Sequence, residues 1–195
     1  MYHLTVIQDS REQTPLKFPD HIKVHLRRSK TPTLIKIKTD VDTLPAGDYT
    51  IEGFDNVVLV ETKRSARELH DNLLTADFRR ASHAFELLQS ATKHPFLVCE
   101  FGQSDLLDET PGTAWGGPAV ADALAYLVAE HGLSLWFAGP RSGALARRRT
   151  AELILRLMIA CVELDYPNFL HGVPDDGLRR RHEPGSSSPN TGAVH

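Results

Sequence analysis

The chain has 195 residues, 41% of them hydrophobic, and a formal net charge of −3 at pH 7. This length suits one well-buried globular domain and excludes two large ones. No apolar run approaches the roughly 20 residues that a membrane span requires, and the N-terminus lacks a signal-peptide pattern, so we expect no membrane partner and no secretion. The net charge gives no sign of nucleic-acid binding. Lys and Arg gather in separate clusters, for each of which a solvated face is the simplest interpretation.

The first third of the chain predicts strands. Residues 3–9 and 57–63 form buried, β-branched runs, whereas residues 24–28 and 33–39 have the pattern of more amphipathic strands. A helical period then runs through residues 65–94, and Ser65 followed three residues later by Glu68 predicts a capping box at its start.

Strands and helices alternate in the remainder. Residues 95–102 and 133–139 predict short strands, residues 119–132 and 143–164 predict helices, and a loop punctuated by Gly and Pro is expected at 102–118. Early strands followed by this alternation predict an α/β fold, a mixed sheet with helices packed on its faces around one core. Residues 172–195 are rich in Gly, Pro, Ser and Arg and predict a disordered tail, which leaves residues 1–171 as the folded domain.

Several kinds of site find no support in the sequence. Cys99 and Cys161 lie in apolar segments with no second Cys or His at metal-ligand spacing, so we expect two buried free thiols. The ten His residues are scattered without a metal-binding spacing. Neither a G-x-G-x-x-G fingerprint nor a Walker loop is present, so no nucleotide cofactor is expected.

The stretch GDYTIEGFDNVVLVETK, residues 47–63, places two acids and an amine around a buried strand. Side chains at i and i+2 of a strand share a face, so Glu61 and Lys63 are expected side by side while Thr62 points the other way. An apparent hairpin folds Asp48 back beside Glu61. Two converging carboxylates suit Mg²⁺, and a neighbouring lysine can order a water nucleophile or balance phosphoryl charge. From this spacing alone, an exposed hairpin with a weak Glu–Lys pair is the simpler interpretation.

The N-terminal strand favours a metal site over an exposed hairpin. It delivers Asp9 at its C-terminal end, followed by Arg11, where ligands of open α/β sheets usually bind. The motifs DSREQTPL, LPAGDY and VETKRSARELHDNL occur in this order. Together they resemble the nuclease domain of the XPF-type structure-specific endonucleases, a branch of the PD-(D/E)XK nuclease superfamily. The resemblance extends from about Leu4 to about Leu164, and its specificity comes from the three motifs together, since each alone is weak.

The resemblance implies a restriction-endonuclease-like fold, a mixed central sheet flanked by helices. It also implies Mg²⁺-dependent hydrolysis of DNA phosphodiester bonds, with Mn²⁺ as a possible substitute. The implied catalytic set is Asp9, Asp48, Glu61 and Lys63. In this set the three acids hold the metal, and the lysine positions the nucleophile and stabilises developing charge.

A supporting set of charged residues is implied as well. Arg11 and Glu12 would support the metal site, and Arg80 falls where the family carries an arginine. Thr62 replaces the usual Arg of the family's E-R-K motif, and Arg64 is a candidate to compensate. Arg11, Arg80 and the basic clusters would bind the DNA backbone without base specificity. Members commonly pair through this domain, so a homodimer or a heterodimer is implied.

Two alternatives stay open. One is a non-catalytic DNA-binding scaffold or partner subunit of a nuclease, although such members typically lose the acids or the lysine that this sequence retains. The other is an unrelated α/β enzyme in which the hairpin is ordinary surface. The sequence shows neither a helicase portion nor a tandem helix-hairpin-helix module, so a preference for branched or flap DNA in repair or recombination rests on the resemblance alone. A nuclease of this type would be cytoplasmic and nucleoid-associated in a prokaryote or phage, and nuclear in a eukaryote.

Overall fold

The computed structural model describes residues 2–27, 29–108, 116–139 and 143–171. Its elements, in chain order, are β1 (Tyr2–Asp9), β2 (His21–Val24), β3 (Thr33–Asp42), β4 (Tyr49–Ile51), β5 (Val58–Lys63), α1 (Ala66–Leu73), α2 (Phe78–Ala91), β6 (His94–Cys99), α3 (Gln103–Leu107), α4 (Gly117–His131), β7 (Ser134–Phe137), α5 (Gly143–Asp165) and the 3-10 helix η1 (Phe169–His171).

The described strands form one seven-stranded sheet in the order β2-β3-β1-β4-β5-β6-β7. β1 runs parallel to β3, and β5, β6 and β7 are mutually parallel neighbours. β4 is antiparallel to both β1 and β5, and β2 is antiparallel to β3. The mixed sheet of an α/β fold is therefore confirmed. Because β4 lies between β1 and β5, the three segments that carry the predicted acids are neighbours in the sheet.

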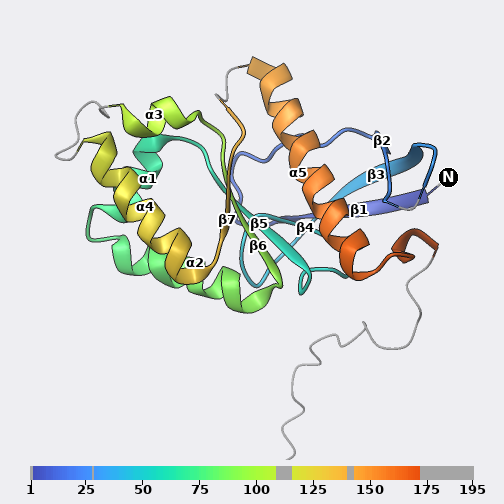
Figure 1. Ribbon diagram of the computed structural model, residues 1–195, viewed down its shortest axis with the longest axis horizontal. Helices are drawn as coiled ribbons and strands as arrows, with labels where there is room; N and C mark the ends of the chain where they lie inside the picture. Colours follow the sequence, from blue (N-terminus) through green and yellow to red (C-terminus); the bar gives the residue numbers. More distant parts are fainter. Residues whose placement is uncertain (1, 28, 109–115, 140–142, 172–195) are drawn as a thin grey trace, which may run out of the picture.

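Helices cover both faces of the sheet. Helices α1 to α4 lie together on one side, and α5 runs along the other (Figure 1). Alternation along β5 sends Val58 and Val60 into the apolar cluster under α5, whereas Leu59 joins the cluster under α1, α2 and α4. The single core expected from the sequence is wrong in this respect, since a sheet covered on both faces has one apolar layer on each side.

The predicted elements differ from the observed ones in three places. The helical period of residues 65–94 contains two helices, because α1 ends at Leu73 and α2 starts at Phe78. The Thr75 hydroxyl donates to the Asp71 carbonyl at 2.5 Å and accepts from Asp77 N at 3.2 Å, which provides a local alternative to continued helix. The strand predicted at 24–28 is wrong, because β2 spans His21–Val24 and shares only Val24 with it. The loop predicted at 102–118 contains α3.

The expectation of two buried thiols is confirmed. Cys99 and Cys161 are buried free thiols, and α4 is capped by Gly132 in the left-handed conformation with φ 60°. Across the described part of the chain, every helix is too short or too polar to span a bilayer. The tail predicted at 172–195 lies outside the described residues.

Candidate active site

The predicted site residues converge where β1 and β5 end. Asp9 is the last residue of β1, Asp48 immediately precedes β4, and Glu61 belongs to the second half of β5. All three acids line one cavity of about 220 Å³, together with Arg11 and the segment 45–47. The convergence that the sequence predicted for these three segments is therefore present.

The backbone of Asp48 is held by both neighbouring strands. Asp9 N donates to the Asp48 carbonyl at 2.8 Å, and Asp48 N donates to the Val60 carbonyl at 2.7 Å. The preceding Gly47 has φ +72°, and a Cβ there would lie 3.1 Å from the Val60 oxygen and 3.2 Å from Leu88 Cδ1. Only glycine fits this position easily, because it combines a positive φ with a close approach to a neighbouring strand.

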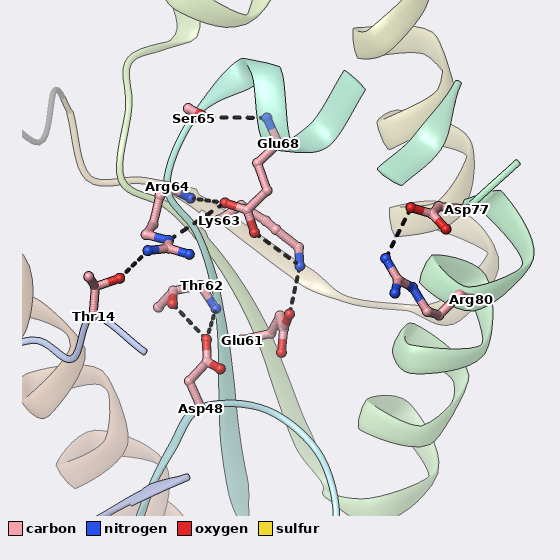
Figure 2. Close-up of polar contacts among 10 residues, drawn as sticks. All are labelled: Thr14, Asp48, Glu61, Thr62, Lys63, Arg64, Ser65, Glu68, Asp77 and Arg80. Carbon is pink, nitrogen blue, oxygen red and sulfur yellow. Dashed lines mark hydrogen bonds and ion pairs between the residues drawn. The ribbon is translucent and has the colours of Figure 1, made fainter. Parts of the chain in front are cut away.

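The side chain of Asp48 is fixed through one oxygen. Oδ2 accepts hydrogen bonds from Thr62 N at 2.7 Å and from the Thr62 hydroxyl at 2.6 Å (Figure 2). Oδ1 accepts none from the described residues. The pKa of Asp48 is raised to about 7, first by burial and then by the nearby Glu61 carboxylate, while the two hydrogen bonds from Thr62 act in the opposite direction. An acid in this environment favours either a proton or a bound cation.

Lys63 lies beside Glu61, as the strand alternation predicted. Its Nζ is 2.8 Å from Glu61 Oε1 and 3.7 Å from Glu68 Oε1 (Figure 2). Burial acts to lower the pKa of Lys63, but the Glu61 and Glu68 carboxylates outweigh it and the net shift is upward. The upward shift favours the ammonium form of Lys63, which suits charge stabilisation.

Glu68 has a role that the sequence did not predict. The serine half of the predicted capping box is present, because the Ser65 hydroxyl accepts from Glu68 N at 3.1 Å, but the Glu68 carboxylate is engaged elsewhere. The Glu68 carboxylate also approaches Lys63, as described above, and Oε2 accepts from Arg64 N at 2.9 Å. The capping box identified the helix start, but its motif carries no sign of a contact back to the preceding strand.

Asp9 is fully engaged with Arg11. Its Oδ1 accepts from Arg11 N and Nε, both at 2.7 Å, and its Oδ2 accepts from Arg11 Nη2 and Leu44 N, both at 2.8 Å. Burial opposes ionisation of Asp9, but these hydrogen bonds and the guanidinium charge together lower its pKa. Asp9 thus anchors Arg11 at the cavity, and its role as a metal ligand stays a prediction.

The other predicted charged residues lie around the site with separate partners. Glu12 Oε1 accepts from Thr14 N at 2.6 Å, and the Arg64 guanidinium donates to the Thr14 hydroxyl. Arg80, on α2, is exposed and pairs with Asp77 at 3.0 Å. Arg80 also lines a second cavity, of about 340 Å³, that includes Lys63.

Arg147 is a structural contact that the sequence did not predict. The Arg147–Arg149 run was expected to be a solvated face, yet Arg147 Nη2 donates to the Thr14 carbonyl at 2.9 Å and to the Pro15 carbonyl at 2.7 Å. It therefore fixes the loop after β1 against α5. Arg148 and Arg149 are exposed as expected.

The ERCC4 domain model matches residues 8–143, which include every predicted site residue. The chain belongs to the ERCC4 domain family. The match confirms the resemblance to XPF-type nuclease domains that the three motifs indicated. It also supports a role as a DNA nuclease.

Two solved structures are similar to this ERCC4 domain. XPF from Aeropyrum pernix is 18% identical with a TM-score of 0.47, over 78% of this chain and 62% of that one. XPF from Aeropyrum pernix in complex with DNA is 19% identical with a TM-score of 0.47, over 90% of this chain and 77% of that one. The chain thus spans less than two thirds of the first structure. No curated protein matches it.

The donor set of this ERCC4 domain fits a hard divalent cation bound by few protein ligands. Among the described residues, no group of three or more His, Cys, Asp or Glu side chains is arranged to hold a metal. Mg²⁺ is commonly bound by one or two carboxylates with waters and substrate phosphates completing its shell. Asp48 and Glu61 supply two such carboxylates, whose mutual repulsion a cation would relieve.

Proposed function

We propose that the chain is a Mg²⁺-dependent DNA endonuclease that hydrolyses phosphodiester bonds at the cavity of Asp9, Asp48 and Glu61. The observation that supports this most is the half-buried Asp48 beside Glu61, with the buried Lys63 ammonium 2.8 Å from the Glu61 carboxylate. Asp48, from the segment before β4, lies beside Glu61 and Lys63 of β5. A surface hairpin with an exposed ion pair would bury none of these groups.

Each residue has a distinct chemical role in this proposal. Asp48 and Glu61 would hold Mg²⁺ or Mn²⁺, with Asp9 as a further candidate ligand. When bound, the ion polarises a phosphate and lowers the pKa of a water molecule. Lys63 keeps its charge and stabilises the negative charge that develops on the phosphoryl oxygens. Glu68 holds Lys63 from the side opposite Glu61.

The surrounding arginines would bind the DNA backbone. Arg11 lines the cavity and Arg80 lines the adjoining one, and each would contact a phosphate of the bound strand. Arg64 is a further candidate because it emerges directly after Lys63. Such contacts add affinity that falls with salt and carry no base specificity. Branched or flap DNA, a role in repair or recombination, and pairing with a second nuclease domain are part of the same proposal.

A cleavage assay tests this function. Labelled flap, fork and linear duplex DNA are incubated with the protein in Mg²⁺, Mn²⁺ or EDTA. We expect cleavage in Mg²⁺ and Mn²⁺, none in EDTA, and none by Glu61→Gln, which keeps the shape of the side chain and removes its charge. DNA binding without cleavage in any ion would refute the enzyme and favour a scaffold.

A further inference from the structure

Thr62 occupies an unusual position in β5. It lies between Glu61 and Lys63, and strand alternation places its side chain on the opposite face of the strand. Its side chain is buried, with 6% of the residue exposed. The hydroxyl nevertheless reaches the site, because it donates to Asp48 Oδ2 at 2.6 Å while Thr62 N donates to the same oxygen at 2.7 Å.

These two donors act against a repulsion. Asp48 and Glu61 are like charges close enough to interact, so an unrestrained Asp48 carboxylate would turn away from Glu61. Hydrogen bonds to an ionised oxygen are among the strong ones in proteins. Because Thr62 is buried, water has little access to replace its hydroxyl as a donor. Oδ2 is thereby held, and Figure 2 shows the other oxygen of Asp48 on the side of Glu61.

A purely structural threonine in the same sheet offers a comparison. Thr50, in β4, is 1% exposed and its hydroxyl donates to the Val58 carbonyl at 2.7 Å. That hydrogen bond joins the Thr50 hydroxyl to the backbone of the sheet. Thr62 differs because its acceptor is a carboxylate that lines the cavity. Both threonines are buried, but they have different partners.

We propose that Thr62 is a positioning residue: it holds Asp48 against the repulsion of Glu61 and so keeps Asp48 Oδ1 available for a divalent cation. The inference rests on the proposed function for the identity of the cation. The orientation of Asp48 is a separate claim that does not depend on cleavage. Thr62→Val removes the hydroxyl at nearly constant volume, Thr62→Ser keeps it, and Thr50→Val removes a buried hydroxyl elsewhere in the sheet.

The first measurement is calorimetric titration of each folded variant with MgCl₂ alone, followed by kcat for DNA cleavage. We expect Thr62→Val to weaken Mg²⁺ binding at least fivefold and to lower kcat at least tenfold. Thr62→Ser should remain within twofold of the wild type in both, and Thr50→Val should lose stability without losing Mg²⁺ affinity. Wild-type values for Thr62→Val, or equal losses of Mg²⁺ affinity in Thr62→Val and Thr50→Val, would overturn the proposal. If Thr62→Val does not fold, Thr62→Ala makes the same deletion without a new methyl group.

The second measurement separates this inference from the function on which it rests. Crystal structures of the wild type and Thr62→Val show the Asp48 carboxylate directly, and we expect it to rotate away from Glu61 in the variant. An unchanged carboxylate overturns the positioning role even if the wild type cleaves DNA. A wild type that binds no Mg²⁺ and cleaves nothing refutes the proposed function, while the two structures still decide the role of Thr62.

Discussion

The raised pKa of Asp48 predicts a specific dependence of stability on pH in the metal-free protein. Burial, and then repulsion by Glu61, raise this pKa from the ordinary 3.8 to about 7. Between these values the folded state binds a proton that the unfolded state has released. The free energy of unfolding therefore falls as pH rises through this window. The free energy of unfolding lost across this window is at most about 4 kcal/mol, because one unit of pKa corresponds to about 1.4 kcal/mol.

Asp48→Asn tests this magnitude because the amide oxygen can still accept from Thr62 while the charge is lost. In urea unfolding with EDTA, we expect Asp48→Asn to gain up to about 4 kcal/mol relative to the wild type between pH 4 and pH 8. Saturating Mg²⁺ at pH 8 should raise the stability of the wild type and leave that of the variant unchanged. Asp55→Asn, in the exposed turn between β4 and β5, serves as the control and should follow the wild type. Parallel pH profiles for the wild type and Asp48→Asn would refute the reasoning.

Three further predictions concern the neighbours of Asp48. Lys63→Met removes the ammonium but keeps most of the buried stem. Single-turnover cleavage should fall about a hundredfold or more, while DNA binding measured by fluorescence anisotropy persists. Cleavage within tenfold of the wild type would contradict the role of the charge. Gly47→Ala should lower the melting temperature more than Gly132→Ala, since both have positive φ but a Cβ at 132 meets nothing within 4 Å; equal losses would contradict the close approach. Arg11→Gln leaves the buried Asp9 without its cation and, because the Arg11 side chain itself is exposed, should cost about 1–2 kcal/mol in chemical unfolding. Adding Asp9→Asn to that variant should recover most of this loss, and no recovery would show that the charge of Asp9 is not the cause.

The sequence predicted the parts of the site that depend on strand geometry. Alternation along β5 was enough to pair Glu61 with Lys63, and a short antiparallel connection was enough to bring Asp48 back beside them. The alternation of strands and helices also predicted a mixed sheet, and the buried run of residues 3–9 placed Asp9 at the end of its first strand. Each of these follows from a local period or a short turn, so each is visible in neighbouring residues.

What the sequence did not predict depends on contacts between distant segments. Arg147 contacts the carbonyls of Thr14 and Pro15, more than 130 positions earlier, and no local pattern distinguishes it from Arg148. Thr62 was expected only to point away from the catalytic face, because the reach of its hydroxyl depends on how closely β4 approaches β5. The break between α1 and α2 was missed for a different reason, since apolar spacing continues across it while the hydroxyl of Thr75 bonds locally to Asp71 and Asp77.

The central claim is that Asp48 and Glu61 together bind one divalent cation. Crystals of the protein soaked in MnCl₂ test it most directly, because anomalous scattering at the manganese edge locates the ion without reference to activity. We expect one strong peak within coordination distance of Asp48 Oδ1 and a Glu61 carboxylate oxygen, and loss of that peak in Glu61→Gln. A cavity without manganese in crystals of protein that cleaves DNA in Mn²⁺, or a peak bound by other residues, would contradict the account.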